Sequence, residues 1–515
     1  MNSVWNLLTG TATKYLLLAA TIAIGIFLMP YTVRHLGTSE YGLWMLVASM
    51  TGYFNLLDLG YGNGLVRHVA DADARGDVTL VNQILSTFVV VYIGLGLLVA
   101  VAAGAMILWV PLFPRMMPSQ VPLARFILAV IGVRIALGFP MTVFGAVTTA
   151  RQRFALNNLV ATVSTIVNAA VQFTLLARGF HVRAVVAGSV AVDLLTYIGY
   201  AWTARRSFPA LQLRLSAFKT SLVRDVTAYS LYMFVISIAV QIGFNLNNIV
   251  VGAVLGTSAV AIYAVTLRLT EAQRNLSNQF NTLMFPVVVR YGAVNDPDAL
   301  RRMLIEGTRL SLTLVCGLTV CLVGFARPLI TRWMGPGFDG AVTPLYVLAV
   351  TGIVLIGQAP LGNILLGTGR HRLVAFASLA EAIVNFVLSV ILVRRFGLLG
   401  VAFGTAIPVF VVNVFVLAPA ACRQLELRVA DFGRAVAMAP FVGAAVASLA
   451  VWVVRTAWPP VALPAIIGEG AIVGVVYLVA LWMFGLDRPL RARYTAFGRQ
   501  LVAMAAHRRA PAPLM

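Results

Sequence analysis

Acidic side chains are scarce in this chain. Of its 515 residues, 17 are Asp or Glu and 38 are Lys or Arg, so the net charge is +21. Nearly all of the basic residues are arginine, and they are spread between apolar runs instead of forming one patch. This distribution argues against a nucleic-acid partner, which needs a continuous basic surface.

Side chains that bind metals or activate nucleophiles are also few. The five histidines and three cysteines show no spacing typical of a metal site or a disulfide framework. The glycines at 60, 62 and 64 do not fit G-x-G-x-x-G, and residues 367–370 lack the lysine of a phosphate-binding loop. The short loops expected on the outer side of the membrane carry few of the carboxyl groups that a membrane glycosyltransferase or polymerase would need. We therefore expect no enzyme, no metal and no cofactor.

Long apolar runs dominate what remains, since 60% of the residues are hydrophobic. About 20 consecutive apolar residues suffice to cross the hydrocarbon core of a bilayer, which is roughly 30 Å thick. The chain is therefore predicted to be an all-α polytopic membrane protein with about 14 transmembrane helices. The predicted spans are 13–33, 41–61, 84–110, 125–149, 156–177, 184–204, 227–250, 259–284, 307–326, 342–366, 373–393, 398–419, 434–454 and 463–485.

An internal duplication organises these spans. The letters LGTS occur at 36–39 and again at 255–258. Further matches follow in the same order at nearly the same spacing: 150–153 with 369–372, 166–168 with 383–385, 178–180 with 394–396 and 187–189 with 403–405. Two repeats of about 215 residues, each with six spans, are therefore predicted. The last two spans have no counterpart.

The arginine distribution predicts the orientation. With the N-terminus in the cytoplasm, 25 basic residues fall in inward segments, 10 in outward segments and three (Arg134, Arg268 and Arg274) inside spans. The positive-inside rule therefore places both termini in the cytoplasm. Six spans is an even number, so the repeats are parallel and are expected to form two lobes around a central cavity.

The predicted organisation includes two amphipathic segments. Leu211, Leu215, Phe218 and Leu222 form one helical stripe with basic residues around it, and the tail repeats this pattern. Such helices favour the surface of an anionic membrane. The predicted parts are an N-terminal lobe (1–208), an amphipathic linker (209–224), a C-terminal lobe (225–424), the two extra spans (425–487) and a basic amphipathic cytoplasmic tail (488–515).

Charged residues inside the spans are the informative ones. A charge at the centre of a membrane helix costs roughly 2.5–3.5 kcal/mol. Six charges facing lipid would cost on the order of 15–20 kcal/mol, more than the net stability of a typical domain. Most must therefore face a wet interior or one another. They are Arg134, Asp193, Arg268, Glu271, Arg274 and Glu381.

Polar residues at helical spacing predict a substrate cavity. Steps of three and four place them on one face of a helix in three spans. Arginine binds phosphate groups, and amides suit hydroxyl-rich groups such as sugars. The predicted cavity residues are Arg268, Arg274, Asn275 and Asn278 in span 8, Gln241, Asn245 and Asn248 in span 7, and Asn55 in span 2.

The same charges have a structural reading. Arg268 and Glu271 lie three residues apart and would pair on one helix, which would fix it to a neighbour. For Asp193 and Glu381, structural pairing and ion coupling are both open. Asp58 lies near a helix end, where it is either a coupling residue or part of a helix-end pair. Glu271, Asp193, Glu381 and Asp58 are the candidates for ion coupling.

The first hairpin carries a resemblance to a known family. LGTSEYGLW and LLDLGYGNGLVR, within residues 36–67, resemble the N-terminal signature of bacterial polysaccharide biosynthesis proteins, the O-antigen-type oligosaccharide flippases. These belong to the multidrug/oligosaccharidyl-lipid/polysaccharide exporter superfamily. Residues 284–286 and 396–405 match the same pattern, and the resemblance covers about 1–424. Spans 13 and 14 exceed the common twelve.

The resemblance implies a function as well as a fold. It implies two six-helix lobes in a V shape that alternate between inward- and outward-open states. Such a protein flips a polyprenyl-diphosphate-linked oligosaccharide across the bacterial inner membrane for O-antigen, capsule or exopolysaccharide synthesis. Arg268 and Arg274 would bind the diphosphate, and a gradient of H⁺ or Na⁺ would supply the energy. A polysaccharide polymerase and glycosyltransferases would be its partners.

Two other functions stay open. A cation-coupled multidrug exporter of the same superfamily would be expected to favour carboxylates and aromatic residues in its cavity. A non-transporting membrane scaffold of a polysaccharide assembly complex would not need charges along one helical stripe.

Overall fold

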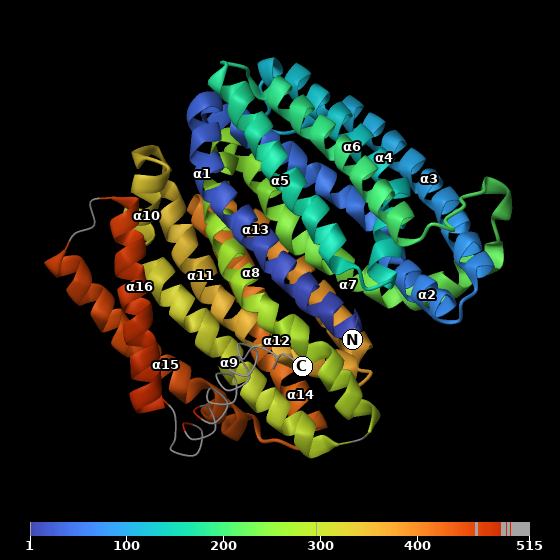
Figure 1. The fold of residues 1–515 in the computed structure, drawn as a ribbon. Coiled ribbons are helices and arrows are strands. Elements are labelled where there is room, and N and C mark those ends of the chain that lie inside the picture. The colour runs from blue at the N-terminus through green and yellow to red at the C-terminus, as the bar shows by residue number, and fades with distance from the viewer. Residues whose placement is uncertain (1, 295, 459–461, 486–490, 492–494, 496–515) are drawn as a thin grey trace, which may run out of the picture. The chain divides into compact units, whose positions relative to one another are not determined.

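Helices account for every regular element in the residues that the structure describes. It is a computed structural model that describes residues 2–294, 296–458, 462–485, 491 and 495 (Figure 1). The α-helices are α1 Asn2–Gly52, α2 Tyr61–Ala74, α3 Val78–Trp109, α4 Val121–Ala150, α5 Phe154–Ala177, α6 Val182–Ser207, α7 Thr220–Leu255, α8 Thr257–Ala293, α9 Pro297–Gly324, α10 Ala326–Trp333, α11 Val342–Gly357, α12 Ala359–Gly367, α13 His371–Val411, α14 Ala418–Gln424, α15 Val429–Ala457 and α16 Leu463–Ala480. Short helical turns join some of them: η1 Tyr53–Asp58, η2 Val110–Leu112, η3 Pro118–Gln120, η4 Leu215–Ala217, η5 Pro336–Ala341, η6 Val412–Leu417 and η7 Leu481–Gly485.

The helices confirm a polytopic membrane protein. Ten stretches of the described residues are long and apolar enough to cross a membrane. Two of these, Thr9–Asp58 and His371–Gln424, each contain two predicted spans separated by a non-helical glycine, Gly37 or Gly397. The predicted spans 7 and 8 correspond to α7 and α8, whose polar residues lower their hydropathy.

The two repeats share their turns in detail. Gly37 and Gly256, each the second residue of an LGTS turn, have nearly the same conformation, with φ of 77° and 89° and ψ of 166° and 174°. Such positive φ values favour glycine because other residues have a Cβ that clashes with the backbone. Forty residues further along in each repeat, Asp77 and Asp296 cap α3 and α9 by accepting a hydrogen bond from the backbone N–H three residues later. These pairs bear out the duplication read from the sequence.

Contacts group the chain into two compact units, which are described separately. Unit 1 comprises residues 1–268 and 371–408, and unit 2 comprises 269–370 and 409–515. The lobes at 1–208 and 225–424, and the separate region 425–487, remain predictions from the sequence.

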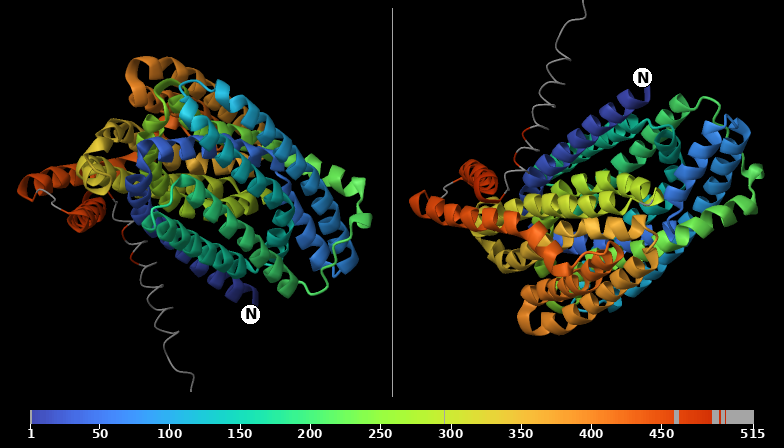
Figure 2. Two further views of the ribbon diagram at one scale, coloured as in Figure 1. Left: turned by 90° about the horizontal axis from the view of Figure 1, so that it is seen from above. Right: turned by 90° about the horizontal axis from the view of Figure 1, so that it is seen from below.

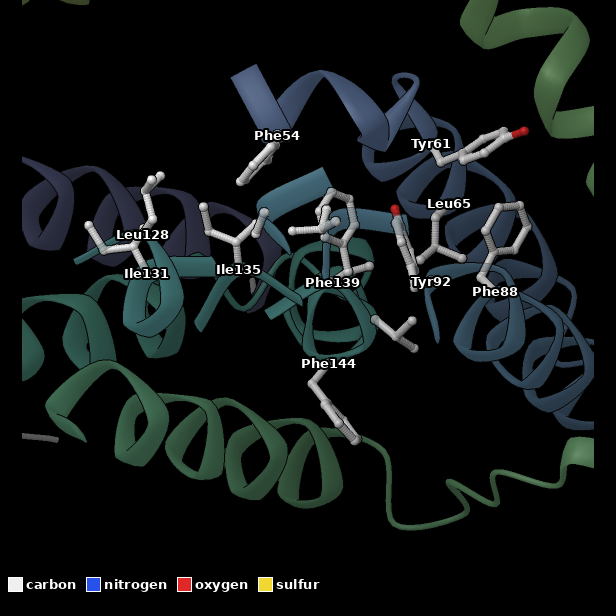
Figure 3. Close-up of a cluster of buried hydrophobic side chains, with 14 of the residues drawn as sticks. Phe54, Tyr61, Leu65, Phe88, Tyr92, Leu128, Ile131, Ile135, Phe139 and Phe144 are labelled. Atoms are coloured by element: carbon white, nitrogen blue, oxygen red, sulfur yellow. The ribbon is translucent and has the colours of Figure 1, made fainter. Parts of the chain in front are cut away.

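The core of unit 1 is a row of aromatic rings. In Figure 1, α3, α4 and α6 run side by side, and α2 covers one end of α3. Figure 3 shows Tyr61, Phe88, Tyr92 and Phe139 in this core, with ring centroids 5.6–6.3 Å apart between neighbours. Phe88 and Tyr92 are fully buried. Such aromatic contacts, worth about 0.5–1.5 kcal/mol each beyond area burial, hold α2, α3 and α4 together.

In unit 2 the two additional helices pack on the repeat. α15 and α16 lie side by side in both views of Figure 2, and both contact α9. The ring of Tyr477 from α16 fits between Gly317 of α9 and Gly443 of α15, and its hydroxyl donates to the carbonyl oxygen of Thr313 at 2.8 Å. The predicted spans 13 and 14 are therefore an integral part of unit 2.

The linker corrects one prediction. No helix runs from Leu211 to Leu222: residues 208–219 are non-helical except for one turn at Leu215–Ala217, and α7 begins at Thr220. Three side chains of α3 bind the backbone of this segment instead. Asn82 accepts from the N–H of Gln212 at 2.9 Å, Ser86 from that of Arg214 at 3.0 Å, and Thr87 from that of Lys219 at 3.2 Å. Because these contacts satisfy the backbone, the linker does not need helical hydrogen bonds. The predicted tail at 488–515 lies outside the described residues, apart from positions 491 and 495.

Replacing Gly317 with valine is expected to lower the free energy of unfolding by about 1–3 kcal/mol. A Cβ at this position would lie 2.9 Å from a ring carbon of Tyr477, so the ring or α9 would have to move. Denaturant unfolding in detergent micelles measures the effect. Gly474→Val on α16 is the matched control, because no heavy atom lies within 4 Å of its Cβ position. Equal destabilisation by the two variants would contradict the packing described here.

Candidate functional site

The polar stripe of α7 lies against the end of α1. Gln241 donates from Nε2 to the carbonyl oxygen of Gly52 at 2.8 Å, and Asn248 donates from Nδ2 to Ser49 Oγ at 2.8 Å. Asn245 lies between them and donates to Gln241 Oε1 at 3.2 Å. The three residues therefore share one helical face, as their spacing predicts. Their role in binding a substrate stays a prediction.

The carbonyl oxygen of Gly52 joins two of the predicted stripes. It accepts a hydrogen bond from Asn55 in η1 at 3.2 Å as well as the one from Gln241. A Cβ on Gly52 would lie 2.8 Å from the amide nitrogen of Asn245, so glycine permits this close approach. The structure thus brings the candidates of spans 2 and 7 together within unit 1.

Arg268 lies against the middle of α1. Its Nη2 is 3.4 Å from the carbonyl oxygen of Thr21. Gly25 lies one turn further along, and a Cβ there would overlap the guanidinium group. The absence of a side chain at Gly25 therefore makes the space that Arg268 occupies. A fixed cation is held in this way on an apolar helix.

The other α8 candidates belong to unit 2. Glu271 is exposed, whereas Arg274 and Asn275 are half-buried. Asn278 lies in α8, but its side chain falls outside the described part of the structure. Their contact with a substrate stays a prediction.

A second polar face of α8 is buried, and the sequence did not distinguish it. Gln273 donates from Nε2 to Thr319 Oγ1 at 2.7 Å, and Asn281 accepts from Ser311 Oγ at 2.8 Å through its Oδ1. Both residues are more than nine-tenths buried. This face binds α8 to α9 within unit 2 and leaves the Glu271–Asn275 face for other contacts.

Asp193 forms an ion pair with Arg134. Arg134 Nη1 lies 2.7 Å from Asp193 Oδ2, and the pair connects α4 with α6. Tyr197 donates from its hydroxyl to the carbonyl oxygen of Arg134 at 3.4 Å. Each charge therefore has a partner, as expected if Asp193 serves in structural pairing. Ion coupling by Asp193 remains a prediction.

Asp58 occupies a helix end. Its Oδ1 accepts from the hydroxyl of Tyr92 at 2.9 Å, and its Oδ2 accepts from the N–H of Gly62 at 3.2 Å. Gly62 is in the first turn of α2, where a carboxylate is favoured by the unpaired N–H groups and the helix dipole. Asp58 therefore caps α2 and ties it to α3.

Glu381 lies near a buried polar chain that sequence analysis missed. It is half-buried on α13, one turn before Asn385. Asn247 of α7 donates to Thr405 Oγ1 at 2.9 Å, and Thr405 lies 3.5 Å from Asn385 Oδ1. These hydrogen bonds could not be predicted from the sequence, because the three residues come from distant parts of unit 1.

Glu469 is a further intramembrane carboxyl that sequence analysis overlooked. It lies in the apolar helix α16, and its Oε2 atom is buried without a hydrogen-bond partner among the described residues. Its position in a predicted span was signal enough to include it. A search of the described residues finds no group of three or more His, Cys, Asp or Glu side chains arranged to hold a metal ion.

Comparison with known proteins identifies relatives along nearly the whole chain. Residues 10–291 match the family described as polysaccharide biosynthesis protein. The chain is 23% identical over 479 residues to the uncharacterized membrane protein EpsK of Bacillus subtilis, covering 90% of this chain and 92% of that protein. It is 21% identical over 418 residues to the putative O-antigen transporter of Shigella flexneri, covering 79% and 94%.

Solved structures show the same fold. The lipid II flippase MurJ in an inward closed conformation aligns with a TM-score of 0.68 at 13% identity, over 92% of this chain and 98% of MurJ. An inward-facing multidrug resistance transporter of the MATE family aligns with a TM-score of 0.62 at 16% identity, over 81% and 95%. At these identities the likeness concerns the fold alone.

The ion pair of α4 and α6 can be tested by a double-mutant cycle. Arg134→Leu or Asp193→Leu alone is expected to lower the free energy of unfolding by about 1–3 kcal/mol, because each leaves an unpaired charge in a membrane helix. The double leucine variant should recover most of that loss. Unfolding in detergent micelles gives the three values. An Asp193→Leu protein as stable as the wild type would show that the pairing contributes nothing to stability.

Proposed function

Because the chain belongs to the polysaccharide biosynthesis protein family, we propose that it is a flippase for a polyprenyl-diphosphate-linked saccharide. It would move this lipid from the inner to the outer leaflet by alternating access, for surface polysaccharide synthesis. The relative named as an O-antigen transporter supports this assignment. The observation that carries it is the placement of Arg268 against Thr21 and Gly25 of α1.

The cargo is proposed from the chemistry of the candidate residues. A guanidinium group stays charged at all physiological pH values and binds phosphate oxygens through two parallel hydrogen bonds. Arg268, with Arg274, would bind the diphosphate. The amide groups of Gln241, Asn245 and Asn248 offer donors and acceptors for sugar hydroxyls if the contacts of α7 with α1 open during transport.

The energy source is proposed to be a gradient of H⁺ or Na⁺. Asp193 is paired with Arg134, and Asp58 is bound by Tyr92 and Gly62. Glu271, Asp193, Glu381 and Asp58 all stay candidates for the coupling residue. The protein would lie in the bacterial cytoplasmic membrane with both termini in the cytoplasm. Glycosyltransferases would act before it and a polysaccharide polymerase after it.

Arg268→Ala is expected to lower the rate of lipid flipping at least tenfold. A hydrogen bond to a charged group contributes about 1.5–3 kcal/mol, and 1.4 kcal/mol corresponds to a factor of ten. Gly25→Val keeps the arginine but removes the space that it occupies, so it should also slow flipping. The assay follows a fluorescent polyprenyl-diphosphate oligosaccharide in proteoliposomes, with and without an ion gradient.

Arg178→Ala at the exposed end of α5 is the matched control and should flip normally. Normal flipping by Arg268→Ala would show that this arginine has a structural role and is not needed to bind the substrate. Efflux of a cationic dye by the wild type without lipid flipping would identify a cation-coupled multidrug exporter. If the wild type shows neither flipping nor dye efflux, a scaffold of the assembly complex is favoured.

A further inference from the structure

An ion pair fills the space between three helix ends in the first repeat. Arg151, at the end of α4, binds both carboxylate oxygens of Asp73 on α2, with the shortest distance 2.7 Å. It also donates to the carbonyl oxygen of Ser207 at the end of α6. Its guanidinium carbon lies 4.7 Å from the centroid of the Phe208 ring. We call these four residues the Arg151 plug.

Matching hydrogen bonds fix the register between the two repeats. The N–H groups of Asp77 and Asp296 bind the carbonyl oxygens of Ala72 and Tyr291, so Asp73 corresponds to Gly292. At the second place, the backbone N–H of Arg153 binds the carbonyl oxygen of Thr148 as that of Arg370 binds Leu365, so Arg151 corresponds to Thr368. This corrects by two residues the sequence match of 150–153 with 369–372. At the third, the backbone of Phe208 binds Ala204 as that of Leu425 binds Ala421, so Ser207 and Phe208 correspond to Gln424 and Leu425.

The second repeat has a pocket where the first has the Arg151 plug. The pocket lies in unit 2, has a volume of about 570 Å³ and is lined by all four counterparts, Gly292, Thr368, Gln424 and Leu425, together with Pro297 and Leu300. Replacement of the ion pair by a glycine and a threonine leaves this space. The size falls within the range of about 300–1,000 Å³ that is typical of sites for small ligands. We call it the Thr368 pocket.

The lining excludes a charged group from the pocket. None of the side chains that line the pocket is charged. Arg301 lies nearby, but it already binds the carbonyl oxygen of Leu425 at 2.6 Å and the carboxylates of Asp298 and Glu426 at 3.0 Å. The first turn of α9 is capped by the carboxylate of Asp296, which opposes an anion at that helix end. The part of a ligand that enters the pocket is therefore expected to be uncharged, and any diphosphate attached to it would lie outside.

The lining does suit a neutral group with hydroxyls. Gln424 lines the pocket, and its Oε1 is a buried atom without a hydrogen-bond partner among the described residues, so a turn of this side chain would present the acceptor to a ligand. An unpaired buried acceptor costs about 1–3 kcal/mol, which a ligand hydroxyl would recover. The hydroxyl of Thr368 donates to the carbonyl oxygen of Ile364 and can still accept. Pro297, Leu300 and Leu425 offer an apolar wall for the C–H face of a ring.

We infer that the Thr368 pocket binds one sugar unit. The arginines of the neighbouring segments place this end of the helices in the cytoplasm by the positive-inside rule. The sugar would come either from the carried lipid-linked saccharide or from a soluble sugar nucleotide. The first source rests on the proposed flippase function, whereas sugar binding itself does not.

The test transplants the ion pair of the Arg151 plug into the second repeat. Gly292→Asp with Thr368→Arg should fill the pocket and abolish sugar binding. Gln424→Leu removes the unpaired acceptor at nearly constant volume and should weaken binding at least tenfold. Arg423→Gln, an exposed neighbour outside the lining, is the matched control and should bind as the wild type does.

Binding is measured by saturation-transfer NMR on the full chain in nanodiscs. The probes are the methyl glycosides of glucose, galactose, mannose and N-acetylglucosamine. Thermal unfolding shows whether each variant is folded. If the double variant is unfolded, the binding measured for Gln424→Leu decides the result. The inference is overturned if no glycoside binds the wild type, or if folded Gln424→Leu binds as strongly.

Competition identifies the source of the sugar. The same sugar is linked through a diphosphate either to a short polyprenyl chain or to uridine. Stronger competition by the polyprenyl form supports the pocket as a site for the carried lipid, and stronger competition by the uridine form supports it as a site for a soluble donor. Flipping is measured in parallel: sugar binding without flipping would contradict the proposed function alone, and flipping without sugar binding would contradict the pocket alone.

Discussion

A backbone that crosses a bilayer must satisfy its own N–H and C=O groups, and this constraint explains the polar contacts at several helix ends. Helices meet it along the spans, so side chains are needed where a helix stops. Asp58 binds an N–H in the first turn of α2, and Asn82, Ser86 and Thr87 bind the linker. The carbonyl oxygen of Gly52, at the end of α1, accepts from Asn55 and Gln241. Much of the polarity inside the spans thus completes the backbone.

The two repeats show which of these contacts the fold requires. The caps Asp77 and Asp296 are present in both, because α3 and α9 begin at the same place and have the same unpaired N–H groups. The side chains that bind the backbone at the C-terminal end of each repeat differ between the two. In the first, Asn82 and Arg151 share this task, with Asn82 bound to Ala210 O and Arg151 to Ser207 O. In the second, among the described residues, the side chain of Arg301 binds the carbonyl oxygen of Leu425 and the carboxylate of Glu426. Since this arginine binds the backbone there, the residues at 292 and 368 are free to be small.

The sequence predicts the elements of this protein much better than their contacts. Span length and apolar composition are local properties, so the helices were predictable, as was the repeat with its paired glycines 37 and 256. The linker was not, because its amphipathic spacing indicates a helix while side chains of α3, more than 120 residues earlier, bind its backbone. Asp193 shows the same limit for the candidate site. Its partner, Arg134, is 59 residues away on another helix, and no spacing rule links the two.

The contacts of the acidic residues bear on the sign of the cargo. A protein that exports cations needs carboxylates free to meet them, and the spans contain few. Arg134 neutralises Asp193, while a tyrosine hydroxyl and a backbone N–H bind Asp58. Each contact occupies a carboxylate oxygen that a cationic cargo would otherwise have to bind. Arg268, by contrast, lies against the carbonyl oxygen of Thr21, in the space that Gly25 leaves for its guanidinium group. A guanidinium group binds phosphate through two parallel charge-assisted hydrogen bonds, which are stronger than a hydrogen bond to a carbonyl oxygen. An arginine at position 268 is therefore compatible with the anionic cargo that we propose.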